Sequence, residues 1–207
     1  MLENSPLTKR HVQRPWTAAD GIGNGAINYA CGAKPIKGWV NVDIFDASFQ
    51  SFLEQSSDQP DIADVFNFDL LAPHPFEDNT FSYAYCEDFV EHLDQRECIL
   101  FLVEVLRTLK PAGILRVATP SLDGVLRRHF WKKDRNQAYS EADQAFTQWG
   151  HKHFFSHSTL KEMGYALGFA GYKKRGYGAS RHQALRNLET RPLQIELNLY
   201  AELRKPG

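Results

Sequence analysis

Cysteine is scarce in this sequence. The three cysteines, Cys31, Cys86 and Cys98, form no CxxC pair, which argues against a disulfide framework and against a cysteine-based structural zinc site. Long hydrophobic runs are absent as well, and no apolar block follows the basic residues at the amino terminus. We therefore expect free thiols and a cytoplasmic protein with neither a signal peptide nor a membrane span.

The protein also has little net charge. The 24 basic and 25 acidic side chains leave a formal net charge of -1, so no global field steers the protein toward nucleic acid, and we do not expect that partner. The 207 residues, of which 43% are hydrophobic, suffice for one domain with a sizeable core. We expect an N-terminal arm over residues 1–25 and a folded domain over residues 26–207.

Apolar clusters alternate with amphipathic stretches, which predicts a mainly parallel α/β sheet with helices on both faces. Apolar residues recur at helical spacing within residues 94–113, and helical patterns return over residues 122–134 and 157–169. Residues 193–203 alternate apolar and polar side chains, which predicts a half-buried edge or antiparallel strand. The other predicted strands cover residues 26–30, 40–45, 62–68, 81–85 and 114–119.

Two glycine turns compete for the tip of the first predicted strand. In an open α/β sheet, ligands bind beyond the carboxyl ends of the strands, where the strand order reverses. The turn over residues 21–25 precedes the first strand, whereas Cys31 and Gly32 follow it. We therefore predict that Gly32 borders a ligand. No GxGxxG string follows this strand, which disfavours a nicotinamide-dependent oxidoreductase.

The link to the second strand is short. Only six residues separate Gly32 from Trp39, fewer than a helical crossover between parallel strands needs. Either the crossover is tight and irregular, or one strand is misassigned. Asp43 ends the second strand, where its two carboxylate oxygens are suited to accept hydrogen bonds from both hydroxyls of a ribose. A turn aspartate that caps the next helix is the alternative.

Four blocks of the sequence resemble a known family. In chain order they are INYACGAKPIKGWVNVDI, FDLLAPHPFEDNTFSYAYCEDFVEHL, LRTLKPAGILRVATPSL and HKHFFSHSTLKEMGYALGF. Together, over about residues 27–200, they resemble class I S-adenosylmethionine-dependent methyltransferases, and most of all the small bacterial type with a short GCG…GWvNvD loop. The resemblance implies a Rossmann-like sheet of seven strands, the last antiparallel, with S-adenosylmethionine across the tips of the first strands.

The resemblance also implies roles for individual residues. Gly32 and its neighbours would approach the methionine part of the cofactor, and Asp43 would hold the ribose. Asp69 would flank the adenine, and the segment 86–88 would border the methyl donor. Alanine stands at position 30, where the family usually has glycine. The implied cofactor-binding residues are Tyr29, Ala30, Cys31, Gly32, Asp43, Asp69, Leu70, Cys86 and Glu87.

Methyl transfer is a displacement at carbon, so catalysis depends largely on positioning, and a base is needed only when the acceptor must lose a proton. Asp88, His92 and His153 are the candidate catalytic residues. Alternatively, Glu91 and His92 only pack on or cap a helix. Metal ligation by His151, His153 and His157 is conceivable, but no neighbouring cysteine or carboxylate completes a set, so we predict no metal site.

A basic run with interleaved aromatic residues lies within residues 127–135 and fits either a phosphorylated or nucleic-acid acceptor or a solvated helix face. Cys31 and Cys86 lack an adjacent base, so we expect them to line the pocket and not to act as nucleophiles. The leading hypothesis is an enzyme that methylates a small-molecule or glycan-type acceptor. The alternative is a non-catalytic binding or scaffold domain with a weakened cofactor site.

Overall fold

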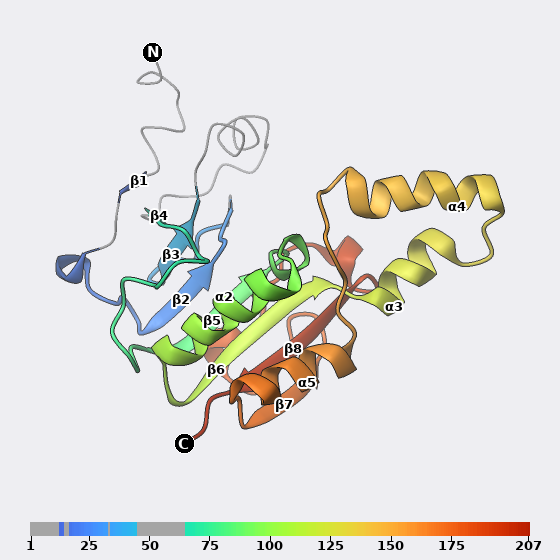
Figure 1. Cartoon of the computed structure of the whole chain (residues 1–207). Coiled ribbons are helices and arrows are strands. Elements are labelled where there is room, and N and C mark those ends of the chain that lie inside the picture. Colours follow the sequence, from blue (N-terminus) through green and yellow to red (C-terminus); the bar gives the residue numbers. More distant parts are fainter. Residues whose placement is uncertain (1–12, 15–16, 33, 45–64) are drawn as a thin grey trace, which may run out of the picture.

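The computed structural model describes the backbone of residues 13–14 and all of residues 17–32, 34–44 and 65–207. One eight-stranded sheet runs through the molecule in the order β1-β4-β3-β2-β5-β6-β8-β7 (Figure 1). The strands are β1 (Gln13–Arg14), β2 (Ala26–Tyr29), β3 (Val40–Asp43), β4 (Val65–Asn67), β5 (Phe81–Glu87), β6 (Leu109–Pro120), β7 (Gly171–Arg175) and β8 (Asn198–Arg204).

The order of the strands confirms the predicted Rossmann-like sheet. β2 pairs in parallel with β3 on one side and with β5 on the other, so the strand order reverses between β2 and β5. The last strand, β8, is antiparallel to β6, as expected. β1 adds a two-residue strand beside β4, so this part of the expected N-terminal arm belongs to the sheet. Phe45 and residues 62–64 of the predicted strands lie outside the described residues.

Two helices cover one face of the sheet. α2 (Gln95–Thr108) begins with a capping box in which Asp94 and Glu97 bond each other's backbone amides. α5 (His157–Leu167) ends where Gly168 takes a φ of 109°, a conformation that glycine adopts without steric cost. α2 packs against α5, and Figure 1 shows both helices in front of the sheet. The buried face of α2 consists of Cys98, Phe101, Leu102, Val105 and Thr108.

The opposite face is covered by irregular chain in the described part of the molecule. Arg116 of β6 is fully buried there, and its guanidinium donates to the carbonyls of Ala179 and Gly176 and to the carboxylate of Glu189. The segment 176–197, with short 3-10 turns at Gln183–Leu185 and Pro192–Gln194, therefore lies over this face.

The C-terminal strand differs from its prediction. β8 begins at Asn198 and not at residue 193, because Pro192–Gln194 forms a 3-10 turn. It is neither half-buried nor at an edge, since six of its seven residues are buried between β6 and β7. β7, whose charged residues Lys173 and Lys174 hide its strand character, forms the edge instead.

The tight crossover between β2 and β3 is real, and two buried asparagines hold it. No helix occurs in its described residues, 30–32 and 34–39. Asn41, which is 0% exposed, accepts from the amide of Ile36 and donates to the carbonyls of Ile36 and Trp39. Asn28 donates to Asn41 and to the carbonyl of Lys34. These side chains replace the backbone partners that a helix supplies.

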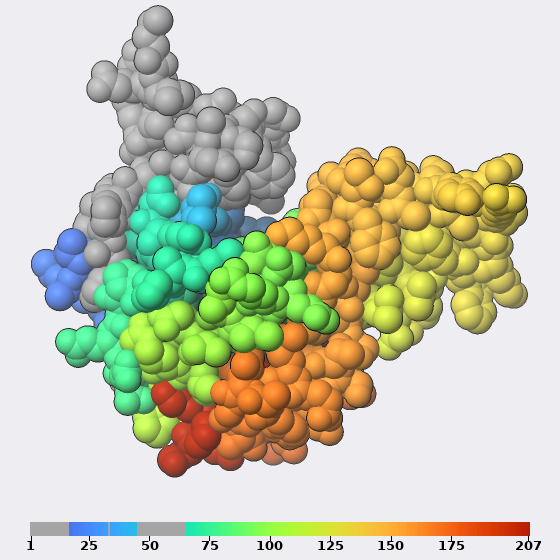
Figure 2. All heavy atoms as spheres, viewed as in Figure 1, coloured from blue at the N-terminus to red at the C-terminus, as the bar shows by residue number. Residues whose placement is uncertain are grey.

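A helical arm leaves the sheet after β6. It contains α3 (Leu122–Val125), a π-helical segment (Leu126–Phe130) and α4 (Arg135–Ala142), so the predicted helix over residues 122–134 is shorter and irregular. Its two halves are joined by the carboxylate of Glu141, which pairs with His129 and Lys133. Figure 2 shows the yellow and gold arm projecting from the body. No described helix has the length and apolar character to cross a membrane.

Candidate active site at the carboxyl ends of the strands

The predicted ligand turn and the predicted ribose carboxylate meet. The amide of Gly32 donates to Asp43 Oδ2 at 2.7 Å, and the amide of Ile44 donates to Oδ1 at 2.7 Å. Burial raises the pKa of Asp43 to about 6, although these two hydrogen bonds oppose the shift. The competing turn, Gly21–Gly25, lies at the other end of β2, where the amide of Asn24 donates to the carbonyl of Gly38.

The backbone conformation of Ala30 explains why glycine is favoured at this position. Its φ is 49°, in the left-handed region where a Cβ atom crowds the backbone. The turn therefore costs more with alanine than with glycine. The next residue, Cys31, is buried, and its amide donates to the carbonyl of Val42, which fixes the turn against β3.

Charged side chains join the tips of β2 and β5. Lys34 Nζ lies 3.7 Å from Glu87 Oε2, and Arg191 Nη2 lies 3.6 Å from Glu87 Oε1. Arg191 also pairs with Asp88. One basic side chain from the turn after β2 and one from the segment 176–197 therefore lie beside the tip of β5. Sequence reasoning missed Lys34 and Arg191, because no local pattern shows that they converge on these carboxylates.

Asp88 has partners on both carboxylate oxygens. Asn198 Nδ2 donates to Oδ1 at 3.0 Å, and Arg191 pairs with Oδ2. The backbone of Asp88 has a φ of 49°, and its amide donates to the carbonyl of Ala118. This arrangement fixes the end of β5. A carboxylate held by an arginine and an amide is poorly placed to take a proton from a third group.

The other predicted cofactor residues differ in what they present. Tyr29 is 0% exposed, its ring packs edge-on against Phe101, and its hydroxyl contacts Thr108. The side chain of Leu70 also lies in the core. Only the backbone of these two residues is left to line the site. Asp69 is exposed, and one of its oxygens accepts from the amide of Leu71.

The surroundings of Cys31 and Cys86, the cysteines at the ends of β2 and β5, make their thiols unreactive. Burial is the main cause that raises the pKa of Cys31, and the neighbouring Asp43 adds to it. Burial likewise raises the pKa of Cys86, which is 1% exposed and belongs to the core. Neither group favours the thiolate form that a nucleophile needs.

Glu91, His92 and His151 form a cluster just beyond β5. One donor atom of each lies within 4.8 Å of the others. Glu91 is 0% exposed; Oε2 accepts from Thr119 Oγ1 at 2.8 Å, whereas Oε1 has no hydrogen-bond partner among the described residues. Burial raises the pKa of Glu91 to about 7 and lowers the pKa of His92 and of His151.

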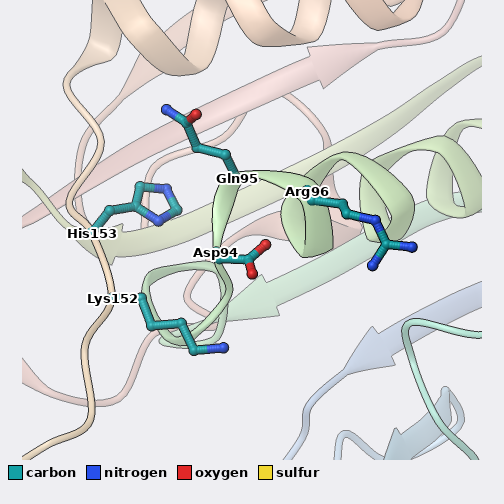
Figure 3. Close-up of a pocket in the computed structure, with 5 residues that line it drawn as sticks. All are labelled: Asp94, Gln95, Arg96, Lys152 and His153. Atoms are coloured by element: carbon teal, nitrogen blue, oxygen red, sulfur yellow. The ribbon is translucent and has the colours of Figure 1, made fainter.

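The three histidines that are neighbours in sequence separate in space. His151 Nδ1 bonds the carbonyl of Ala145, His153 Nδ1 bonds the carbonyl of Leu93, and His157 Nδ1 bonds the hydroxyl of Tyr172. His153 lies beside an open pocket whose lining is shown in Figure 3: Asp94, Gln95, Arg96, Lys152 and His153. Its Nε2 has no partner among the described residues, and burial lowers its pKa.

Part of the chain matches a family of known proteins. Residues 20–117 match the sequence profile of the methyltransferase domain family. The resemblance to class I S-adenosylmethionine-dependent methyltransferases is thereby confirmed. The matched segment contains the crossover, Asp43 and the tip of β5. The arm and the strands β7 and β8 lie outside it. The chain matches no curated protein sequence.

Solved methyltransferase structures share the fold over most of the chain. A possible histamine N-methyltransferase from Thermotoga maritima has a TM-score of 0.57 and 15% identity, with 87% of this chain and 81% of that chain covered. A methyltransferase from Methanosarcina mazei has a TM-score of 0.53 and 15% identity, with 87% and 92% covered.

A longer neighbour carries bound ligands. The Haemonchus contortus phosphoethanolamine N-methyltransferase 2, in complex with phosphomonomethylethanolamine and S-adenosylhomocysteine, has a TM-score of 0.52 and 12% identity. The match covers 94% of this chain but 49% of that chain. The methyltransferase domain described here therefore spans about half the length of the nematode enzyme.

Proposed function

We propose that the protein is an S-adenosylmethionine-dependent methyltransferase that acts on a small-molecule or glycan-type acceptor. The observation that carries the proposal is the meeting of the Gly32 amide and the Asp43 carboxylate at the point where the strand order reverses. Asp43 holds the ribose of the cofactor, and the backbone of residues 29–32 follows its methionine part. Asp69 and Leu70 flank the adenine, and Cys86 and Glu87 border the sulfonium.

When bound, S-adenosylmethionine supplies an electrophilic methyl group. Transfer of that methyl group would require the chain to hold the nucleophilic atom of the acceptor in line with the sulfur–methyl bond. His153 is the best-placed base among the three candidates, because the residue lines the open pocket and its buried Nε2 is unpartnered within the described residues. His92 is the second candidate. Asp88 acts through position, since Arg191 and Asn198 hold its carboxylate.

The pocket beside His153 supports a polar acceptor. Its lining offers a carboxylate, an amide, a guanidinium and an ammonium group from Asp94, Gln95, Arg96 and Lys152. The nematode neighbour carries a small phosphorylated amine, which is consistent with a small-molecule substrate class. The glycan-type acceptor and the cytoplasmic location rest on the sequence and stay predictions.

Calorimetric titration with S-adenosylmethionine and S-adenosylhomocysteine tests the proposal. We expect saturable binding by the wild-type protein and a loss of about 10- to 100-fold in affinity for Asp43→Ala, as for a lost charge-assisted hydrogen bond. Asp143→Ala, an exposed aspartate in the arm, is the matched control and should bind as the wild type does. No heat at millimolar ligand would leave only the alternative, a non-catalytic scaffold domain.

A further inference from the structure

We propose that Glu91, His92 and His151 bind a divalent transition-metal cation such as Zn²⁺ beside the tip of β5. Glu91 and His92 lie in the 3-10 turn Val90–His92, which directly follows the end of β5. His151 lies at the base of the helical arm, 59 positions later than His92 by their numbers. The cluster is the one group of potential ligands that the described residues bring together.

The unsatisfied carboxylate oxygen is the first argument. Glu91 Oε1 is buried without a hydrogen-bond partner in the described part of the chain, while Oε2 is satisfied by Thr119. A buried carboxylate oxygen without a partner is costly. The nearest basic group is His92 Nε2 at 3.9 Å, which is too long for a hydrogen bond. A cation between the two would satisfy both.

The orientation of the imidazoles is the second argument. His151 Nδ1 bonds the carbonyl of Ala145 at 2.7 Å, which leaves Nε2 to bind an ion. A metal-binding histidine usually donates its second ring N–H in this way, because the hydrogen bond fixes both the tautomer and the direction of the ring.

The backbone also holds His151 in place. The amides of Lys152 and His153 both donate to the carbonyl of Glu91, at 2.8 and 3.4 Å. The rings of His92 and His151 have centroids 4.9 Å apart. The base of the arm is therefore attached to the same residue that supplies the carboxylate, and the three ligands belong to one connected unit.

The donor set fits a zinc-like ion with open coordination. Two imidazoles and one carboxylate are the three protein ligands of one class of catalytic zinc site, in which water or substrate takes the fourth position. With bonds of about 2.0–2.1 Å, tetrahedral donors lie roughly 3.3 Å apart. The cluster, at up to 4.8 Å, must therefore contract by about 1–1.5 Å. His92 is 39% exposed at its side chain, so its ring has room to turn toward the other two ligands.

This site does not depend on the proposed methyl transfer, because it rests on side-chain geometry alone. If both are correct, His92 is a ligand and not a base, since a metal-bound nitrogen has no free lone pair, and His153 remains as the base. A titration of metal can therefore fail while cofactor binding succeeds, and the reverse also holds.

The test is metal binding by the full chain after treatment with chelator and desalting. Titration with Zn²⁺ should give one site per chain, and Co²⁺ should give visible absorption bands of a site with nitrogen ligands. Glu91→Gln and His151→Gln, which preserve side-chain size, should each weaken Zn²⁺ binding at least about tenfold. His157→Gln, whose ring bonds Tyr172, is the control and should bind as the wild type does.

Circular dichroism and thermal melting show whether each variant folds. Should a variant fail to fold, His92→Gln at the partly exposed position replaces it. The proposal is overturned if the wild type binds no Zn²⁺, or if folded Glu91→Gln and His151→Gln bind it as tightly as the wild type and His157→Gln do.

Discussion

The carboxylate of Asp43 accepts a 2.7 Å hydrogen bond from the amide of Gly32, so the end of β3 is tied to the turn that follows β2. The same carboxylate is largely removed from water, and burial raises its pKa to about 6. Its ionisation therefore falls in an accessible pH range.

Cofactor binding should accordingly depend on pH. Only the ionised carboxylate has both oxygens free of a proton to accept from ribose hydroxyls. Affinity for S-adenosylhomocysteine should be highest above about pH 6 and should decrease as the pH falls through the pKa that Asp43 has in the folded protein. Below that pKa the affinity should decrease roughly tenfold per pH unit. Calorimetry from pH 5 to 8 measures this. Asp43→Asn cannot ionise and should show weak binding without the step at pH 6, whereas an identical step in that variant would assign it to another group.

Ala30→Gly should stabilise the fold. The alanine has a φ of 49°, and relief of this strain is worth about 1 kcal/mol in the free energy of unfolding. Ala112, with a φ of 61° within β6, offers a matched control. Both Ala30→Gly and Ala112→Gly should raise stability in urea unfolding. Only Ala30→Gly should change cofactor affinity, and tighter binding would show that the methyl group crowds the site.

Asn41→Ala should destabilise the crossover. The side chain bonds Ile36, Trp39 and Asn28, and its loss leaves several buried polar groups unpaired at about 1–3 kcal/mol each. We expect a loss of about 2–4 kcal/mol in urea unfolding and weaker cofactor binding, because the turn at Gly32 loses its support. Asn136→Ala, at an exposed position on α4, should change neither quantity by much. Equal effects of the two variants would contradict the role of Asn41.

The buried ion pair of Arg116 and Glu189 should contribute more to the stability of the fold than an exposed ion pair does. Their atoms lie 2.6 Å apart, and both side chains are 0% exposed. Glu189→Gln removes the closer of the two carboxylates beside the buried guanidinium and leaves only Glu202, whose Oε1 lies 3.5 Å from Arg116 Nη1; it should cost about 3 kcal/mol. Glu162→Gln breaks the exposed pair with Lys161 and should cost under about 1 kcal/mol. Thermal unfolding compares the two, and an equally small loss for Glu189→Gln would show that Glu202 or water compensates the charge of Arg116.

The fold was predictable where its cause is local. Runs of apolar residues set the strands, and the helical spacing of apolar residues predicts α2. β7 escaped prediction because the charged residues of GYKKR conceal an edge strand that needs only backbone pairing. The irregular cover over Arg116 escaped for a related reason: its partners, Glu189 and the carbonyls of Gly176 and Ala179, lie more than 50 positions away in sequence.

The residues of the candidate site also fall into those that the sequence predicts and those that it does not. The order of strand, turn and strand was enough to place Gly32 and Asp43 at one end of the sheet, since parallel strands direct their carboxyl ends to the same edge. The partners of Asp88 could not be foreseen, because Arg191 and Asn198 arrive from a segment whose path depends on packing.

By itself the sequence determined the order of the elements and the parallel sheet, because these depend on hydrophobic periodicity, and four of its blocks pointed by resemblance to the methyltransferase family. Only the tertiary structure decided which charges meet. It separated His151 from His153 and His157 and brought it to the buried carboxylate of Glu91. Electrostatic and metal-binding chemistry depends on distances of a few ångströms, and those distances are set by packing between segments far apart in the chain.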